Sequence, residues 1–320
     1  MEYTEISGAG VVRKVPCTRI DGRTVIVTGS LLLMAAVESE EYQEGDVVRA
    51  PNHFVAALSE RTGLRPDIFT FRQKPDDPTP RFPFFYEQDS VAAIRVVSYL
   101  DWWNNRVSTD LRCDVRKAAK RGVVVRPVSF DDEFVKGVVE IYNETPIRQG
   151  RPFWHYGKSF DAVKRENGTY LERSEFFGAF MGEELIGFLK IVYVDRLARL
   201  MQIIAKVSHW DKRPLNILIA KAVERCEAKG CTMLTYGRYR YSQEADSLSA
   251  FKHRNGFEEI LIPKYYIPLT VKGRAALRLR LHHGARRFVP APVVGFLKRL
   301  RAYIYGLSVP RMSATTRRSS

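Results

Sequence analysis

The strongest pattern of hydrophobic and polar positions lies between residues 131 and 270. Apolar side chains at helical spacing predict a helix that begins at Asp131 or Asp132 and runs to about Tyr142. The same spacing predicts a second helix over Lys158–Arg173. Alternating apolar and polar residues then predict three antiparallel strands joined by tight turns, over Phe176–Met181, Leu185–Val194 and Leu197–Ala205.

A long helix and a last group of strands follow. Pro214 stands at the expected first helical position and Gly230 just past the end, which are the places where these residues favour a helix. Beyond it we expect a strand over Thr232–Tyr236, a helix over Ser247–Arg254, and two strands over Phe257–Ile262 and Tyr265–Leu269.

Shorter runs of both kinds occupy residues 11–106. We expect strands over Thr24–Val27, Asp67–Phe71 and Ala92–Val97, and helices over Leu31–Glu38 and Asn52–Arg61. The segment KPDDPTPRFPFF holds four prolines and predicts a loop. A basic helix over Ser108–Arg121, capped by Thr109 or Asp110, precedes a short strand, VVVRPV. This alternation indicates an α/β protein.

Composition excludes several classes of protein. The 320 residues suggest about two domains, and 45% apolar side chains are typical of a folded chain. No apolar run reaches the roughly 18 residues of a membrane-spanning helix, and the N-terminus lacks the features of a secretory signal, so we expect a cytoplasmic protein. The four cysteines and six histidines show no metal-ligand spacing, which predicts reduced structural thiols and no metal site.

The formal charge of +15 is concentrated at the C-terminus. Glu259 is the last acidic residue, and thirteen lysines and arginines follow it, which leaves the first 259 residues nearly neutral. Residues 271–310 are basic and amphipathic in pieces. They predict either attachment to an anionic membrane surface or a solvated helix that packs its apolar stripe on the body. The last ten residues, RMSATTRRSS, are expected to be disordered.

The order of elements over residues 131–270, with the segment FKHRNGF, resembles the GNAT acyltransferase fold. The whole chain is most similar to the Fem-type peptidoglycan aminoacyltransferases and related envelope acyltransferases, which pair two GNAT-like halves. The basic segment LRCDVRKAAKRGVVV, the stretch ETPIRQGR and the lysine of FKHRNGF carry this resemblance. It implies an α/β (α+β) fold with a mixed sheet flanked by helices, in two halves of which the first is degenerate.

This resemblance suggests a division of the chain into five parts. They are a degenerate N-terminal half over residues 1–106, a basic linker helix and strand over 107–130, a catalytic domain over 131–270, a basic amphipathic tail over 271–310, and a disordered end over 311–320.

In GNAT enzymes, backbone amides of the fourth strand polarise the acyl carbonyl, and the pyrophosphate of coenzyme A rests on the N-terminus of the next helix. The matching strand here is RLARLMQIIAK, but the usual glycine-rich loop is replaced by KVSHWDKRPLN. The cations of this loop bind phosphates or are merely solvated. Fem-type enzymes take aminoacyl-tRNA and tolerate loss of the loop, so the donor stays open. The candidate donor-binding residues are Gln202, Ile203, Ile204, Lys206, Lys212, Arg213 and Asn216.

The stretch YNETPIRQGRPFWHY is the densest in polar and aromatic side chains. Arginine suits oxyanions and aromatic rings stack on sugars, so we expect an acceptor site here, with a structural loop as the alternative. Glu144 and His155 are the candidate bases. The candidate acceptor-binding residues are Asn143, Arg148, Gln149, Arg151, Trp154 and Tyr156.

Two further segments complete the expected site. In YGRYRYS, Tyr236 and Arg238 are expected to bind substrate and Tyr239 to act as an acid, with surface stacking as the alternative. Lys252 aligns with the lysine that Fem-type enzymes use to stabilise charge near the transferred carbonyl, although an isolated helical lysine is more often solvent-exposed.

We therefore expect an N- or O-acyltransferase that acts by direct attack on a glycan or lipid-linked envelope precursor, from the cytoplasm or the inner face of the membrane. Its co-substrate is acetyl-CoA or another acyl-CoA, or else aminoacyl-tRNA, and no cofactor is bound permanently. The other class is an inert RNA- or membrane-binding module on the same fold, because fold does not guarantee activity.

Overall fold

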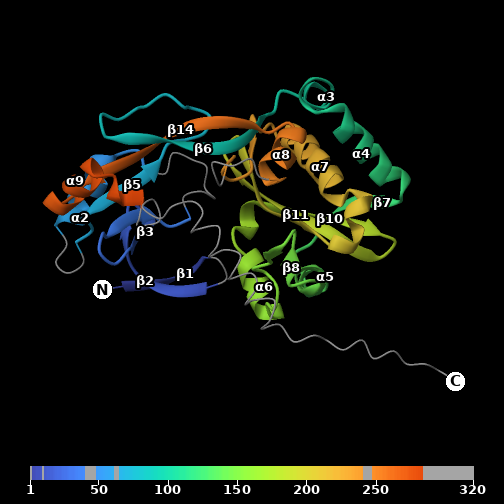
Figure 1. Ribbon diagram of the computed structural model, residues 1–320, viewed down its shortest axis with the longest axis horizontal. Coiled ribbons are helices and arrows are strands. Elements are labelled where there is room, and N and C mark those ends of the chain that lie inside the picture. Colours follow the sequence, from blue (N-terminus) through green and yellow to red (C-terminus); the bar gives the residue numbers. More distant parts are fainter. Residues whose placement is uncertain (1, 9–10, 40–47, 61–64, 241–246, 284–320) are drawn as a thin grey trace.

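The computed structural model describes residues 2–8, 11–39, 48–60, 65–240 and 247–283, and its centre is one mixed sheet (Figure 1). In spatial order its twelve strands are β1 (Glu2–Gly8), β2 (Val11–Ile20), β3 (Arg23–Thr28), β4 (Met34–Val37), β5 (Ile68–Arg72), β14 (Glu258–Pro268), β6 (Tyr86–Arg95), β13 (Met233–Thr235), β12 (Leu197–Ala205), β11 (Glu184–Val194), β10 (Ser174–Met181) and β7 (Val123–Val128). A separate pair joins β8 (Ile147–Arg148) to β9 (Arg151–Pro152).

Helices cover both faces of the sheet. The α-helices are α2 (Pro51–Ser59), α3 (Tyr99–Asp101), α4 (Thr109–Lys120), α5 (Asp132–Asn143), α6 (Phe160–Asn167), α7 (Pro214–Ala228), α8 (Ser247–Arg254) and α9 (Val271–Arg278). A π-helical turn, η1 (Trp102–Arg106), and three 3-10 turns, η2 (Leu171–Arg173), η3 (Val207–Lys212) and η4 (Leu281–His283), complete the described helices.

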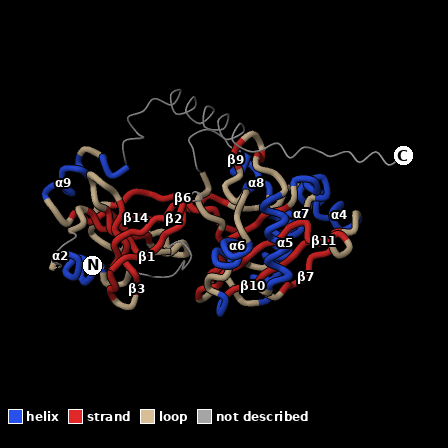
Figure 2. Tube along the Cα trace, turned by 90° about the horizontal axis from the view of Figure 1, so that it is seen from below, coloured by secondary structure: helices blue, strands red, loops and turns tan. Residues whose placement is uncertain are grey.

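Strands far apart in sequence pair at the middle of the sheet. β6 lies between β13 and β14 and is antiparallel to both, with Met233 opposite Arg95 and Glu258 opposite Ala93. β14 then pairs with β5. Figure 2 shows β1–β3 with α2 and α9 at one end of the molecule, and β7, β10 and β11 with α4, α5 and α7 at the other. The division of the chain into five parts stays a prediction. The hydrogen bonds of β6 to β13 and β14 join the two ends of the molecule in one sheet.

Two apolar layers enclose the C-terminal end of the sheet. On one face, α4 and α7 bury Leu111, Leu218 and Val223 against Leu189. On the other face, α5 and α6 bury a second set against β10 and β11: Phe134, Val138, Ile141, Val163, Phe176 and Phe188. A strand buried on both faces has few polar positions, and β11 is accordingly buried from Leu185 to Val192.

The N-terminal end has its own core, built largely from aromatic rings. Phe54 of α2 stacks on Phe69 of β5 with ring centroids 5.4 Å apart. Phe71 stacks on Tyr265 of β14 at 5.0 Å. α9 buries Ala276 against Ile68, as the helix-packing alternative expects, whereas membrane attachment of the tail stays a prediction. Residues 279–283 are also described, whereas residues 284–310 of the predicted tail and the predicted disordered end, 311–320, lie outside the described residues.

One expected helix is wrong, one is shorter than expected, and two expected strands are a single strand. The expected helix over Leu31–Glu38 is instead β4, because Val37 pairs with Val25 and short apolar runs fit either structure. The expected helix over Lys158–Arg173 begins at Phe160 and ends at Asn167. The last two expected strands are one, since pairing with β6 continues through Pro263.

The other expected elements of residues 108–254 are confirmed, with ends shifted by a few residues. Asp131 caps α5 by accepting a hydrogen bond from the Phe134 amide. Ser108, rather than Thr109 or Asp110, caps α4. Among the described residues, no helix combines the length and the apolar character that crossing a membrane requires.

Candidate functional site

β12 carries a bulge and parts from β13 halfway along its length. Its pairing with β11 shifts register between Gln202 and Leu200, which leaves Met201 as the extra residue. β12 pairs with β13 only over 197–199. Beyond Thr235 the chain bonds to β6 instead, where the Tyr236 amide donates to the carbonyl of Ala92 at 2.8 Å.

The second half of β12 therefore has no strand partner on its β13 side in the described part of the chain. This is where the resemblance predicts that backbone amides polarise the acyl carbonyl. Gln202 is half-buried there. Ile203 and Ile204 pack into the two opposite apolar layers, so their side chains serve the core and only their backbone is offered to a substrate.

Glu144 occupies the amides that follow β12. Its carboxylate accepts hydrogen bonds from the Val207 amide, from the Ser208 amide at 2.9 Å and from the Ser208 hydroxyl at 2.6 Å. Burial raises the pKa of Glu144, but the hydrogen bonds from Ser208 and Val207 and the charge of Arg148 outweigh it, and the pKa lies below its usual value. Glu144 is thus a carboxylate cap on η3, which makes it a weak candidate for the base.

Arg148 makes several contacts within the protein. Its side chain is 11% exposed and lies 3.7 Å from Glu144. The guanidinium donates to the carbonyl of Ala205 at 2.8 Å and to that of Ile141 at 2.6 Å, and it lies 3.8 Å from the centroid of the Phe153 ring. These contacts tie the loop between α5 and α6 to the end of β12, and they favour a structural role over acceptor binding.

The three cations predicted to bind phosphates all pair with carboxylates. The pairs are Lys206 with Glu184 at 2.7 Å and with Glu140 at 3.4 Å, Lys212 with Asp211 at 2.8 Å, and Arg213 with Asp114 at 3.2 Å. A phosphate that bound here would have to compete with these carboxylates.

The N-terminus of α7 offers few free amides. The Arg213 amide donates to the carbonyl of Trp210 at 3.1 Å, Pro214 has no N–H, and the Asn216 amide donates to the carbonyl of Arg213 at 3.2 Å. Of the four amides that a helix start usually exposes, that of Leu215 is left. An anion-binding helix start needs several such amides, so the structure provides a poor cradle for a pyrophosphate.

His155 is sealed inside the loop. It is 2% exposed, its ring centroid lies 4.1 Å from that of Tyr142, and the Lys158 ammonium lies 3.4 Å from its Nδ1. Burial and the charges of Lys158 and Arg148 lower the pKa of His155 to about 2. A histidine with so low a pKa binds a proton weakly, which argues against His155 as the base.

Asn143 and Gln149 also bind other parts of the chain. The Asn143 side chain accepts from the Gly157 amide at 2.7 Å and donates to the carbonyl of Lys158 at 3.2 Å. Gln149, at a left-handed φ of 50°, accepts from the Ser247 hydroxyl at 3.1 Å. Their contacts link α5 to α6 and the loop to α8.

Three of the predicted acceptor residues remain accessible. Arg151 is exposed on β9 and Tyr156 is half-buried. Trp154 is 47% exposed, with the Lys158 ammonium 4.0 Å from a ring centroid. Acceptor recognition by Arg151, Trp154 and Tyr156 stays a prediction.

Lys252, Tyr236 and Arg238 come together where the chain leaves β13. Lys252 is 1% exposed, its ammonium donates to the carbonyl of Arg238, and it lies 4.9 Å from the Tyr236 ring centroid. Arg238 is half-exposed and 3.5 Å from Asp89. Burial, followed by nearby carboxylates, raises the pKa of Tyr239, so its hydroxyl stays protonated as an acid must be.

The glycine of FKHRNGF is required by a close approach. Gly256 has φ of +79°, and a Cβ there would lie 2.8 Å from Nε1 of Trp102. That Nε1 donates to the carbonyl of Asn255 at 3.1 Å. The buried tryptophan thereby fixes the turn that follows α8 and holds Lys252 in place.

Sequence reasoning missed a second buried lysine. Lys190 of β11 is fully buried, and its ammonium donates to the carbonyls of Asn167 and Thr169 and to the Thr169 hydroxyl. Burial lowers its pKa to about 8. Its signal was a single lysine inside the apolar strand ELIGFLKIVYV. It pairs opposite Gln202, next to the bulge.

Neither a family model nor a curated protein matches this sequence significantly. Solved structures do match its fold. FemX is 12% identical over 87% of this chain and 90% of its own, with a TM-score of 0.56. The C-terminal domain of a protein named as a lysylphosphatidylglycerol synthetase from Agrobacterium fabrum is 11% identical over 83% and 86%, with a TM-score of 0.54. L-PGS from Bacillus licheniformis is 13% identical over 83% and 87%, with a TM-score of 0.51. The likeness confirms the predicted Fem-like GNAT fold.

Proposed function

We propose that this protein is an acyltransferase that moves an aminoacyl group from aminoacyl-tRNA to an amine or hydroxyl of a cell-envelope precursor. The fold and the open second half of β12 support acyl transfer in general, because both strand divergence and free backbone groups suit a polarised carbonyl. The choice of donor rests on a narrower observation. The Glu144 carboxylate occupies the backbone amides that follow β12, which form the candidate anion site.

The Glu144 carboxylate takes the Val207 and Ser208 amides that a phosphate would otherwise use. One free amide remains at the start of α7, and the nearby cations are paired. The negative charge of Glu144 would repel a pyrophosphate, and its carboxylate already occupies the amides that a pyrophosphate would use. This arrangement favours a donor other than acyl-CoA, whereas the sequence alone placed acyl-CoA first.

The face of α4 provides a surface for a polyanion. Arg116, Lys117 and Lys120 are exposed on it, and none of them forms an ion pair with another described residue. α4 packs on α7, the helix that follows the anion site. A row of unpaired cations suits the phosphate backbone of an RNA, whose binding then weakens steeply with salt.

The proposed reaction needs no covalent enzyme intermediate. The acceptor nitrogen or oxygen attacks the ester carbonyl, and the ester C–O bond to the tRNA ribose breaks. Backbone amides of β12 and the Lys252 ammonium would stabilise the developing oxyanion, and Tyr239 would give its proton to the departing ribose oxygen. The proton lost by the nucleophile passes to water, and the Tyr239 phenolate regains a proton from water. The acceptor would bind near Arg151, Trp154 and Tyr156.

The test supplies both donors to the full-length chain. Bacterial tRNA charged with labelled amino acids, or labelled acetyl-CoA, is incubated with the protein and a membrane extract, and label is followed into lipids and lipid-linked glycans. We expect transfer from charged tRNA that Lys252→Met reduces and Lys190→Met leaves unchanged. Equal or faster transfer from acetyl-CoA would refute the donor assignment. RNA binding without transfer from either donor would instead support the inert binding module.

A further inference from the structure

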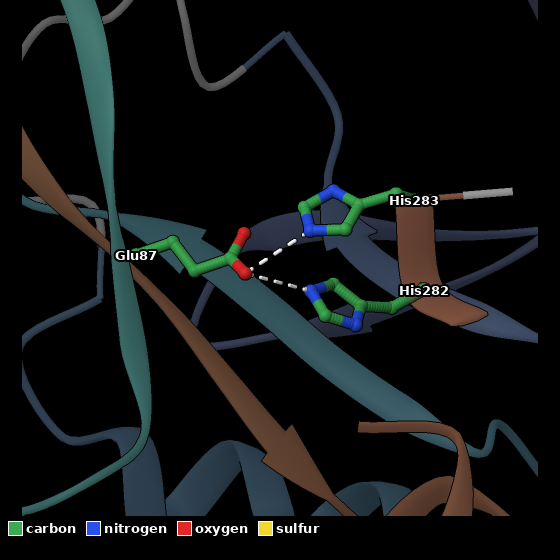
Figure 3. A group of neighbouring side chains, drawn as sticks. All are labelled: Glu87, His282 and His283. Atoms are coloured by element: carbon green, nitrogen blue, oxygen red, sulfur yellow. Dashed lines mark hydrogen bonds and ion pairs between the residues drawn. The ribbon is translucent and has the colours of Figure 1, made fainter. Parts of the chain in front are cut away.

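Two consecutive histidines face a glutamate that the proposed acyl-transfer site does not use. His282 and His283 belong to η4, and Glu87 lies near the start of β6 (Figure 3). Nε2 of His282 lies 3.2 Å, and Nε2 of His283 3.0 Å, from the same Glu87 oxygen, Oε1. One ligand atom from each residue lies within 4.8 Å of the other two. The fold therefore gathers three ligating groups from segments 195 residues apart.

The spacing agrees with the ligand shell of a transition metal. Zinc bonds of about 2.0–2.1 Å in tetrahedral geometry place neighbouring ligand atoms about 3.3 Å apart. Both nitrogen–oxygen distances are within a few tenths of an ångström of that value. Two imidazoles and one carboxylate are also a ligand set that zinc accepts while keeping a fourth position for water.

Packing holds the first histidine in position before any ion arrives. The His282 side chain is fully buried, with ring centroids 4.7 Å from Tyr266 and 6.2 Å from Phe85. Its Nδ1 is buried without a hydrogen-bond partner in the described part of the chain, so Glu87 is its polar contact there.

The other two groups leave a path for an ion. The side chain of His283 is 34% exposed and that of Glu87 28% exposed. After His283 the sequence contains no histidine, cysteine, aspartate or glutamate. Within the described residues the group has these three ligands, and water would fill the fourth position.

We propose that Glu87, His282 and His283 bind one divalent transition-metal ion of the zinc class. The ion would fasten η4 to the sheet at the point where the described chain ends and the basic C-terminal residues begin. The sequence analysis predicted no metal site, because a pair of adjacent histidines acquires its carboxylate from a strand far away in the chain.

The test uses the full-length protein without a histidine tag, stripped with EDTA. Calorimetric titration with Zn²⁺ should show one ion per chain, and Co²⁺ should give the visible absorption bands of a four-coordinate site. We expect His283→Ala and Glu87→Gln each to weaken Zn²⁺ binding about tenfold or more. His253→Ala, which removes an exposed histidine of α8, should bind as the wild type does.

Glu87→Gln separates a metal site from a pair of hydrogen bonds. Glutamine keeps the shape and an oxygen that accepts from both rings, but it lacks the charge that an ion needs. At a Zn²⁺ concentration near the dissociation constant of the wild type, the ion should raise the melting temperature of the wild type and raise that of this variant much less. The proposal is overturned if the wild type shows no saturable binding, or if Glu87→Gln and His283→Ala bind Zn²⁺ as tightly as the wild type.

Discussion

The loop between α5 and α6 and the segment after β13 look alike in sequence and differ in the structure. Both are dense in arginines and aromatic rings. In the loop, the Arg148 side chain is 11% exposed, His155 is buried, and both contact groups of the protein itself. After β13, the side chains of Arg238 and Arg240 are 50% and 63% exposed, beside a strand that has lost its partner. A polar stretch is therefore evidence for a site only when its groups remain available.

The difference has a topological cause. The connection between α5 and α6 has little regular structure beyond the two-residue strands β8 and β9, so polar side chains satisfy part of its backbone, as Asn143 does for Gly157 and Lys158. The segment after β13 finds backbone partners in β6 and needs fewer of its side chains for that purpose. Arg238 and Arg240 each pair with one carboxylate, Asp89 at 3.5 Å and Glu259 at 3.3 Å, but both side chains stay at least half-exposed and can also reach a substrate.

The largest expected effect is the loss of stability when Arg148 is replaced. Arg148→Ala leaves Glu144 without its cation and the carbonyls of Ala205 and Ile141 without a donor. We expect unfolding in urea to need about 3 kcal/mol less free energy. Arg151→Ala, an exposed change in the same loop, should stay within about 0.5 kcal/mol. If the two variants were equally stable, the loop would not be a structural connector.

Lys252→Met should lower the rate of transfer about thirtyfold, which is about 2 kcal/mol of transition-state stabilisation. Lys190→Met is the matched control, since both lysines are buried donors to backbone carbonyls. We expect it to change the rate less than threefold. Equal losses in the two variants would mean that burial of a lysine, and not the place of Lys252, determines activity.

Glu144→Gln distinguishes a cap from a base. We expect a loss of about 1 kcal/mol of stability at pH 7, after allowing for the screening of a partly exposed group. The folded pKa of Glu144 is depressed, so its stabilisation is present above the ordinary carboxylate pKa and disappears as the pH falls below it. The stability gap between wild type and variant, measured in urea, should therefore close towards acid pH. A large loss of activity at unchanged stability would restore Glu144 as the base.

Periodicity predicted much of the C-terminal end of the fold. The apolar positions at helical spacing in α5 and α7, and the alternating positions in β10 to β12, arise because these elements bury one or both of their faces. Such patterns can be recognised within a short segment of sequence. The swap of β6 into the place between β13 and β14 is not local. No residue of β13 or β14 indicates a pairing with β6, which lies more than a hundred positions away in the sequence.

The candidate site was predicted in part for the same reason. The position of Lys252 came from its resemblance to a family motif, whereas its burial depends on Trp102 and the turn at Gly256. The pairing of Lys206 with Glu184 and the capping by Glu144 involve residues 22 and 64 positions apart. Sequence shows which groups can bind phosphate, but not which carboxylates reach them first.

The smallest expected effect is that of replacing His155 on the pH dependence of the transfer rate. A base that matters near neutral pH gives the rate a pH dependence close to its own pKa. Because burial and nearby charges lower the pKa of His155 to about 2, its ring is neutral from pH 5 to 8 and cannot shape the profile. His155→Phe keeps an aromatic ring against Tyr142 and Trp154. The variant should therefore transfer with the wild-type pH profile, measured over that range with charged tRNA. Loss of an inflection between pH 5 and 8 would show that His155 opens to solvent during turnover and would give the loop a part in the chemistry.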